Sequence, residues 1–449
     1  MRVVIVGAGP TGLVTAAGLA RRGHVVTVVD RDPGPAPDGG WDRAGVMQFH
    51  HPHAFRGQVV DVLGSELPEA LDAVLAAGAE QLEIMPTGGG PHVRLGLRCR
   101  RATFERVLRS VVAAEPGVTV ARGHVQRVLA EDGRATGVLV DGARMDADLV
   151  VDASGRAGRA TKDLRGPLLG GDCGVAYVSR QYVLRPGAEF GPMTMPIAAV
   201  AFYHGYGVIC FPHDAGVFSV VVLRAADDRV LAATRAEPVF ESVAATVPLL
   251  AAWTDADRAV PLTPVLPGGR LRNTYCGQLD AQGRVPLPGL VFAGDAVCTT
   301  NPSAGRGVAL SFLQVQRLLA MLDEHPGDAE SATRALDVWC TDAVRPWFSD
   351  HVECDAARTA RWAGAPIDPA ARQPTDLLTE AAMADPSLMP VIGPYLGMAA
   401  LPASLDAIRP RVRELLDGGW RPAEPDGPTR DDLADLVARH ADEPVAVAG

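Results

Sequence analysis

The stretch RVVIVGAGPTGLVTAAGLARRGHVVTVVD, residues 2 to 30, decides the fold of this chain. It predicts an apolar strand, a glycine-rich turn, a helix and a second strand, in that order. Gly7 permits the sharp turn, Gly9 lets the backbone approach a pyrophosphate, and Gly12 lets the helix lie close to the sheet. The helix N-terminus, at Pro10 and Thr11, would face the anion.

The second strand of this unit ends on an acid, Asp30, which Arg31 follows. In dinucleotide-binding folds, an acid at this position holds the ribose hydroxyls. The strand, the helix and the acid therefore accompany the glycine motif in the expected order. We predict a Rossmann-type dinucleotide-binding domain with Asp30 and Arg31 in its binding site.

A distant second segment, VFAGDAVCTTNPSAGRGVALSFL at residues 291–313, points to FAD as the dinucleotide. Its strand would place Gly294 and Asp295 next to a ribityl chain. A domain that binds only NAD does not need such a second segment. The amides of the turn and helix start that follow would stabilise negative charge on a flavin ring. The turn residues expected to face the cofactor are Pro302, Gly305, Arg306 and Gly307, with Arg306 facing solvent or a phosphate.

Together these motifs resemble the flavoprotein monooxygenases of the para-hydroxybenzoate hydroxylase type, which have a GxGxxG start, a middle DG segment and a late GD motif. RAGVMQFHHPHAF at residues 43–55 and VDASGRAGR at residues 151–159 further resemble actinobacterial flavin epoxidases that act on polyether precursors. YVSRQY at residues 177–182 is similar to their first substrate-domain strand. The likeness covers residues 1–315 and implies a flavin-dependent oxygenase.

The resemblance also assigns residues to the surroundings of the cofactor. In the family, an Arg at the start of the helix expected from residue 101 lies near the FAD. Arg101 is the better match for this position and Arg100 is the alternative. Thr103 is the expected N-cap of that helix. Val125 stands where such folds bind adenine through the backbone. The remaining cofactor-proximal residues that the resemblance implies are Arg43, Asp152, Gly155, Arg156 and Asp295.

The run from Arg43 to His53 supplies the candidate catalytic residues. The resemblance puts Arg43 and Gln48 beside the flavin, with His51 and His53 close by. Arg43 would give a fixed positive charge, and a histidine could transfer protons during turnover. A purely structural role for the histidines is the alternative. No metal is expected, because no carboxylate or further His stands at a compatible spacing.

Departures from the family pattern leave the electron source open. The middle motif reads Ala153-Ser154-Gly155 instead of A-D-G, and Val297-Cys298 replaces the His after the late motif. No second GxGxxG follows Gly12, so no separate nicotinamide domain is predicted. NAD(P)H or a partner flavin reductase would therefore supply electrons, with O2 as co-substrate. None of the tryptophans lies in a WxWxIP stretch, so halogenation is not expected.

The predicted fold class is α/β, with an interleaved domain order. A discontinuous FAD-binding domain covers residues 1–75, 98–165 and 270–330, a β-sheet substrate-binding domain covers 76–97 and 166–269, and a helical region covers 331–449. Residues 82–101 predict two strands around a glycine-rich turn. The apolar run at 195–211 predicts an antiparallel meander, because His204, Gly205 and Gly207 interrupt it.

Composition narrows the class of protein. The chain has 449 residues, 47% of them hydrophobic, which suffices for two or three cores. A net charge of −11 argues against a nucleic-acid partner. The seven cysteines show no CxxC spacing, which argues against zinc or a disulfide framework. The N-terminus lacks a charged leader, so we expect a cytoplasmic protein without membrane contact.

The sequence therefore predicts an FAD-dependent monooxygenase of specialised metabolism. It would insert one oxygen atom into an apolar small molecule, by epoxidation or hydroxylation, through a flavin C4a-hydroperoxide. The pocket would be lined by Leu, Val, Met and rings such as Phe202, Tyr203, Phe211 and Phe218. An FAD-dependent dehydrogenase, an isoprenoid-type double-bond reductase and a non-catalytic flavin carrier are the alternatives.

Overall fold

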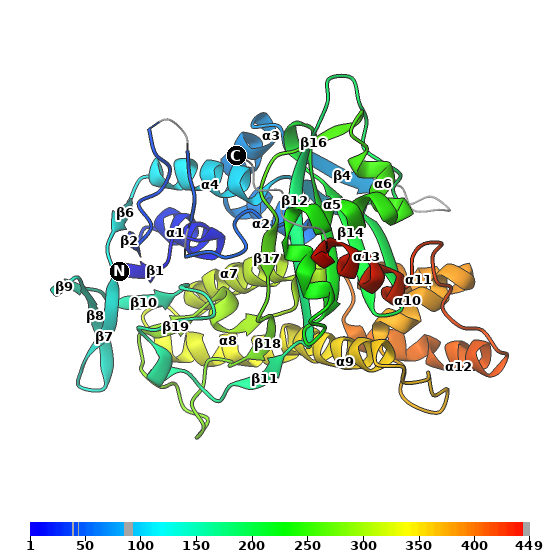
Figure 1. Ribbon diagram of the computed structural model, residues 1–449. Helices are drawn as coiled ribbons and strands as arrows, with labels where there is room; N and C mark the ends of the chain where they lie inside the picture. Colours follow the sequence, from blue (N-terminus) through cyan, green and yellow to red (C-terminus); the bar gives the residue numbers. More distant parts are fainter. Residues whose placement is uncertain (38–39, 44, 85–92, 443–449) are drawn as a thin grey trace. The chain divides into compact units, whose positions relative to one another are not determined.

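The computed structural model describes residues 1–37, 40–43, 45–84 and 93–442. The chain divides into two compact units, both visible in Figure 1. The first unit comprises Met1–Phe49, Ala54–Gly171 and Arg272–His351. The second unit comprises His50–His53, Asp172–Leu271 and the residues from Val352 onward.

A five-stranded parallel sheet, in the order β19-β10-β1-β2-β6, forms the centre of the first unit. Figure 1 shows β1 in blue beside β10 in teal, although more than a hundred residues separate them in the sequence. Valines and other apolar residues fill β1, β10 and β19 and are buried on both faces, which is typical of parallel sheets, whereas the edge strand β6 is only partly buried. The strands are β1 (Arg2–Val6), β2 (Val25–Asp30), β6 (Val118–Arg122), β10 (Leu149–Asp152) and β19 (Leu290–Phe292).

The helices of the first unit follow the predicted order. Helix α1 (Pro10–Arg21) has Pro10 in its first turn and buries nine of its residues, as expected for a helix packed on a sheet. Helix α4 (Arg101–Ala113) begins after Arg100, so Thr103 lies inside the helix and the predicted Thr103 cap is wrong. The other helices are α2 (Gly57–Glu66), α3 (Pro68–Ala76), α7 (Gly307–Glu324) and α8 (Ala329–Ala343).

Three small sheets complete this unit. β4 (Glu80–Ile84) and β5 (Val93–Arg98) pair as the two predicted strands, and the turn between them, at 85–92, lies outside the described residues. β5 also pairs with β3 (Phe55–Arg56), which joins residues 76–84 to the first unit, whereas the sequence assigned 76–97 to the substrate-binding domain. The remaining strands are β7 (Val125–Glu131), β8 (Arg134–Val140), β9 (Ala143–Asp146), β11 (Leu169–Asp172), β18 (Arg272–Tyr275) and β20 (Cys298–Thr299).

The second unit is built on an antiparallel sheet in the order β13-β14-β15-β12-β16, with β17 also paired to β12. The predicted meander is present, because β13, β14 and β15 pair in succession. Helices α5 (Glu237–Thr246) and α6 (Pro248–Thr254) belong to this unit. The strands are β12 (Val175–Leu184), β13 (Ala199–Tyr203), β14 (Tyr206–Pro212), β15 (Val217–Ala225), β16 (Ala259–Pro261) and β17 (Leu266–Gly268).

The two faces of this sheet carry different residues. Strand alternation sends Phe218, Val220 and Val222 into a core with α5, α6 and the last helix, α13 (Arg430–Asp442), and Val221 and Leu223 to the opposite face. That opposite face, called the second face below, carries an apolar cluster with Trp362 packed against it. The cluster comprises Cys173, Val175, Tyr177, Ala198, Ile209, Val221, Leu223 and Leu271.

Helices dominate the chain after residue 331, as predicted, but the boundary between the two units falls inside α9 (Arg345–Trp362). The last helix, α13 (Arg430–Asp442), inserts Leu433 and Val437 into the core under the sheet. No helix in the described residues combines the length and apolarity needed to cross a bilayer. The other helices of this region are α10 (Thr375–Ala384), α11 (Met389–Leu396) and α12 (Arg409–Asp417).

Candidate functional site

Three turns meet at the carboxyl edge of the parallel sheet in the first unit. A Cβ on Gly7 would lie 2.6 Å from the Ala153 carbonyl oxygen, so the turns after β1 and β10 are in contact. A Cβ on Gly294 would lie 2.8 Å from Thr11 Oγ1, which joins the turn after β19 to the start of α1. The edge where parallel strands end is the usual ligand site of such sheets. Three motifs far apart in the sequence thus form one candidate site.

The glycines of this site differ in what surrounds them. A Cβ on Gly12 would lie 2.0 Å from the Gly7 carbonyl oxygen, so Gly12 is required by the close packing of helix and turn. A Cβ on Gly9, Gly155 or Gly307 would meet no protein atom within 4 Å. Gly9 and Gly155 leave space above the backbone at the turns after β1 and β10, and Gly307 leaves it at the start of α7, where FAD is expected. The residues present therefore fit a dinucleotide that lies against bare backbone.

Asp30 lies at the end of β2, where the ribose is expected. Its Oδ2 accepts hydrogen bonds from the Ala8 amide at 2.7 Å and from Arg43 Nη2 at 2.9 Å, while Oδ1 accepts from the Asp32 amide. The acid thereby fixes the glycine turn directly. Arg31, in contrast, is exposed and lies against Gly45.

A buried chain of alternating charges runs from Asp30 across the first unit. Arg43 Nη1 donates to Glu105 Oε2 at 2.5 Å, and the other oxygen of Glu105 accepts from Arg101 Nε. Burial lowers the pKa of Arg43, but its acidic neighbours outweigh this effect and raise the pKa overall. Sequence reasoning missed Glu105. Its spacing of four residues from Arg101 in α4 was the available signal.

Asp152 uses its carboxylate to hold its own turn. Oδ1 accepts from the Ser154 amide at 2.9 Å and from Ser154 Oγ at 2.5 Å, and Oδ2 accepts from Arg165 Nη2 at 2.7 Å and from Thr161 Oγ1. The Asp152 side chain is fully buried. The residue therefore shapes the middle turn, in which Gly155 has a φ of +81°. No local sequence signal pointed to Arg165.

Asp295 is partly buried at the start of the third turn. Desolvation raises the pKa of its carboxyl, and the positive charges of Arg101 and Arg156 oppose that rise. Gln314 Oε1 of α7 accepts a hydrogen bond from the Gly294 amide at 3.0 Å and so fixes the backbone beside Asp295. An acid between two arginines, at the edge where the three turns meet, is suited to hold a polyhydroxylated chain next to a pyrophosphate.

Arg306 differs from the expectation that it would face solvent. Its side chain is buried, pairs with Asp350 Oδ2 through Nη1 at 2.8 Å, and lies over the Trp347 ring at 4.5 Å from the centroid. The ion pair and the ring compensate for the loss of water around the guanidinium. Arg306 therefore anchors the turn before α7 within the first unit.

The histidine cluster belongs to the second unit. His51 Nδ1 lies 2.7 Å from Ser179 Oγ, the ring stands edge-on to Tyr177, and Pro267 provides a backbone hydrogen bond. Burial lowers the pKa of His51 to about 4. His53 Nδ1 bonds the His51 carbonyl oxygen at 3.0 Å. These contacts hold the His51 ring in place on the second face, and the lowered pKa keeps the ring neutral at physiological pH.

The remaining predicted residues have less specific surroundings. Val125 is buried at the start of β7 and pairs with Val140. Gln48 is half-buried in the first unit, and Pro302 is exposed in the turn before α7. Among the described residues, no three His, Cys, Asp or Glu side chains gather as metal ligands do.

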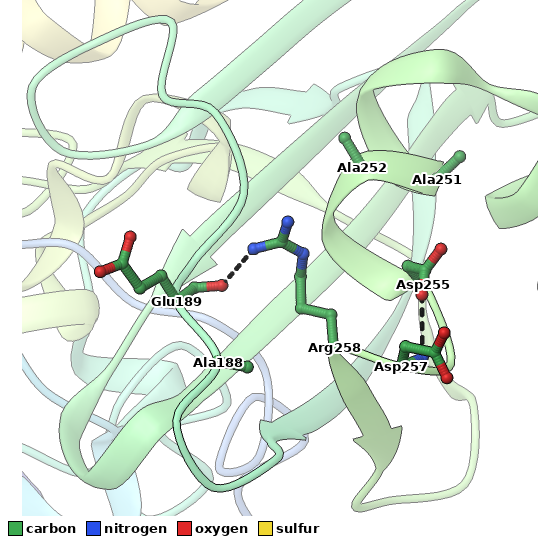
Figure 2. Close-up of a pocket in the computed structure, with 7 residues that line it drawn as sticks. All are labelled: Ala188, Glu189, Ala251, Ala252, Asp255, Asp257 and Arg258. Atoms are coloured by element: carbon green, nitrogen blue, oxygen red, sulfur yellow. Dashed lines mark hydrogen bonds between the residues drawn. The ribbon is translucent and has the colours of Figure 1, made fainter.

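A separate surface hollow of about 710 Å³ lies in the second unit. Figure 2 shows the Arg258 side chain between the Glu189 backbone, to which it donates, and Asp255, which directly follows α6. None of the predicted site residues lines it. The lining residues are Ala188, Glu189, Ala251, Ala252, Asp255, Asp257 and Arg258.

Comparison with known families and sequences gives partial matches. The family profile of Glucose inhibited division protein A matches residues 2–165. The chain is 28% identical over 354 residues to Protein Rv3254 of Mycobacterium tuberculosis, covering 70% of this chain and 71% of that protein. It is 32% identical over 162 residues to the tRNA uridine 5-carboxymethylaminomethyl modification enzyme MnmG of Caldicellulosiruptor saccharolyticus, of which it spans only 24%.

Solved structures match over much more of the chain. A triple mutant of the flavin-dependent brominase Bmp2 superposes with a TM-score of 0.63 at 16% identity, covering 93% of this chain and 99% of that one. PqsL of Pseudomonas aeruginosa, a probable FAD-dependent monooxygenase, gives a TM-score of 0.54 at 16% identity, covering 81% and 99%. The predicted fold class is thereby confirmed.

Proposed function

We propose that this protein is an FAD-dependent monooxygenase that inserts one oxygen atom into an apolar small molecule, by epoxidation or hydroxylation. The observation that carries the proposal is the meeting of three glycine turns at one sheet edge. A glycine leaves open space above its backbone at the turns after β1 and β10, at Gly9 and Gly155, and at the start of α7, at Gly307. This arrangement supports FAD, which has a ribose, a pyrophosphate and a ring system to place along such an edge.

Each part of the site has a distinct task in this proposal. Asp30 would bind the adenosine ribose, and Arg43 and Glu105 would hold that acid in place. The start of α7 at Gly307 would present amides to the flavin ring, where a helix N-terminus stabilises negative charge. Bound flavin would supply the activation of O2, which protein side chains do not supply by themselves.

The second unit supports an apolar substrate. The second face of its sheet is lined mainly by Val, Leu and Ile side chains with Tyr177, and only a few hydroxyl and amide groups accompany them. Buried polar residues of that face include Ser179 and Gln181 on β12, which bond to His51 and to the His50 carbonyl oxygen respectively, and Ser219 on β15. A substrate with a hydrocarbon body suits such a surface.

NAD(P)H or a partner flavin reductase would provide the electrons. The chain has one GxGxxG motif, and the middle turn lacks the A-D-G pattern. We expect that free reduced flavin from a reductase supports turnover. Rapid reduction of the bound flavin by NADPH alone, observed in stopped-flow absorbance, would contradict a requirement for a reductase.

The test of the proposal combines a spectrum with product analysis. The purified protein should carry FAD, consume O2 and convert members of an alkene and phenol panel to products heavier by one oxygen atom. Gly9→Val is the matched negative control, because a Cβ added at this position meets no protein atom within 4 Å. A hydrogenated or dehydrogenated product without O2 insertion would favour a reductase or dehydrogenase. If the protein binds FAD but no panel member and no electron donor changes the flavin spectrum, a flavin carrier is favoured.

A further inference from the structure

The turn that precedes α7 is held from three sides within the first unit. At its start, the Asn301 amide donates to Asn273 Oδ1 at 2.6 Å, and the Asn301 side chain accepts the Ser303 amide at 3.0 Å. At its end, Arg306 pairs with Asp350. The middle of the turn is held by Arg56, which stands at the beginning of α2.

Arg56 binds two consecutive backbone carbonyls of this turn. Its Nε donates to the Ala304 oxygen and to the Gly305 oxygen, both at 3.2 Å, and its Nη2 donates to the Ala304 oxygen. A planar guanidinium presents several donors in a fixed fork, so it can hold two acceptors at a defined angle. Lysine, with one compact ammonium group, cannot reproduce this geometry.

The backbone of the turn fits this contact closely. Gly305 has a φ of +62°, a conformation that favours glycine. A Cβ on Gly305 would also lie 2.5 Å from the Ala54 side chain, two residues before Arg56. Gly305 therefore permits both the turn and the approach of the segment that carries Arg56.

The contact fixes the direction of the next amide. Peptide groups are planar, and the described residues contain no cis peptide, so the Arg306 N–H points opposite to the Gly305 carbonyl. Because Arg56 binds that carbonyl, the Arg306 N–H is directed away from Arg56. It joins the amides at the start of α7, an 18-residue helix.

We propose that Arg56 is a positioning residue for the flavin, which orients the amides at the start of α7 by holding the Ala304 and Gly305 carbonyls of the preceding turn. This inference rests on the proposed FAD site. Without Arg56, the two carbonyls would lose their donors and the peptide planes could rotate. The amides would then stabilise negative charge on the flavin ring less well.

The experiment uses sulfite, which adds reversibly to an oxidised flavin ring and leaves a negative charge on it. Sulfite titrations of the FAD-loaded protein would be followed by absorbance for wild type, Arg56→Ala, Arg56→Lys and Arg94→Ala. Arg94 is a matched control, because its side chain is 45% exposed and pairs with Asp61 at the surface. Apoprotein melting temperature and FAD content would be measured on the same samples.

We expect sulfite to bind at least tenfold more weakly to Arg56→Ala, with a lower flavin reduction potential. Arg56→Lys should show an intermediate or equal loss, and Arg94→Ala should match wild type. Wild-type sulfite affinity and reduction potential in Arg56→Ala would overturn the inference and leave the FAD site standing. If Arg56→Ala does not fold, the same comparison for Arg56→Lys decides. A wild-type protein that binds no FAD would overturn the proposed function and this inference together.

Discussion

Arg43 donates to Glu105 across 2.5 Å, and neither side chain is appreciably accessible to water, with exposed fractions of 4% and 0%. Glu105 also accepts from Arg101, so one buried carboxylate serves two guanidinium groups. Removal of one partner from such a pair leaves an uncompensated charge in the interior. The link connects the acid that ends β2 with the helix that starts at Arg101.

Glu105→Ala should therefore lower the free energy of unfolding by about 3–5 kcal/mol, and it should weaken FAD binding as Asp30 loses its support. Arg43→Met combined with Glu105→Leu should recover only part of the stability, because Asp30 and Arg101 each lose a partner, and it should not recover the FAD affinity. Glu131→Ala is the control, since its pair with Arg144 is about half exposed and contributes little. Urea unfolding and FAD titration measure both quantities; full FAD affinity in the double variant would refute the role given to Arg43.

Gly9→Ala should exclude the cofactor and leave the apoprotein intact. The backbone at Gly9 has a φ of −78°, which any residue adopts, and an added Cβ meets no protein atom within 4 Å. FAD affinity should fall at least a hundredfold with an unchanged apoprotein melting temperature. Gly12→Ala, by contrast, should destabilise the fold by about 1–3 kcal/mol or more, because its Cβ would overlap the Gly7 oxygen. FAD binding at wild-type strength in Gly9→Ala would contradict the placement of the pyrophosphate at this turn.

Asp295→Asn should raise the apoprotein's stability while it lowers FAD occupancy. Burial raises the pKa of this carboxyl, so the folded state binds its proton more tightly than the unfolded state does. The charged form consequently destabilises the fold as pH rises from the ordinary Asp range through the raised pKa. An uncharged amide avoids this cost but loses a strong acceptor for hydroxyl groups. Differential scanning calorimetry of the apoprotein at pH 7 measures the stability, and the flavin content measures the occupancy. Lower stability with full FAD occupancy would contradict both parts of this prediction.

His51 should make the stability of the chain depend on pH. Its pKa is lowered from 6.5 to about 4 in the folded state, so the unfolded state binds more protons between these values. Stability should therefore fall as pH drops through that window, by about 2 kcal/mol between pH 7.5 and pH 5. His51→Gln should abolish this dependence, while His124→Gln, at an exposed position, should preserve it. Activity should show no His51 titration between pH 5.5 and pH 8.

Leu433→Ala should test the place of α13 in the second unit. Leu433 is fully buried among the sheet and helix α5, so its truncation should cost about 2–5 kcal/mol. Leu401→Ala, 39% exposed in the same unit, should change the free energy of unfolding by less than about 1 kcal/mol. Equal melting temperatures for both variants would show that α13 does not stabilise the fold.

The sequence predicted those parts of the molecule whose cause is local. The β1–α1–β2 unit follows from apolar periodicity and from glycines that sit in their own turns. The meander of β13, β14 and β15 was also readable, because Gly205 and its neighbours mark the turns. The fold class needed no further information.

Other parts depend on contacts between distant residues, which no local pattern encodes. Arg43 and Glu105 are 62 positions apart, and Arg56 lies 248 positions from Ala304. Arg306 was expected to face solvent or a phosphate; it does not face solvent, because it is buried with its partner Asp350, which lies 44 positions away. The domain position of 76–84 likewise depends on the pairing of β5 with β3. The roles of His51 and Gln48 in turnover stay predictions.

The parallel sheet of the first unit has a consequence for the synthesis of the chain. β19, at Leu290–Phe292, pairs with β10, whose sequence emerges from the ribosome far earlier. A nascent chain that ends before β19 presents β10 as an open strand edge, and such edges recruit strands from other molecules. The whole antiparallel sheet of the second unit is made in this interval, since it lies between β10 and β19 in the sequence. During translation, therefore, the antiparallel sheet of the second unit can form from its own local hairpins while the parallel sheet of the first unit still lacks its last strand.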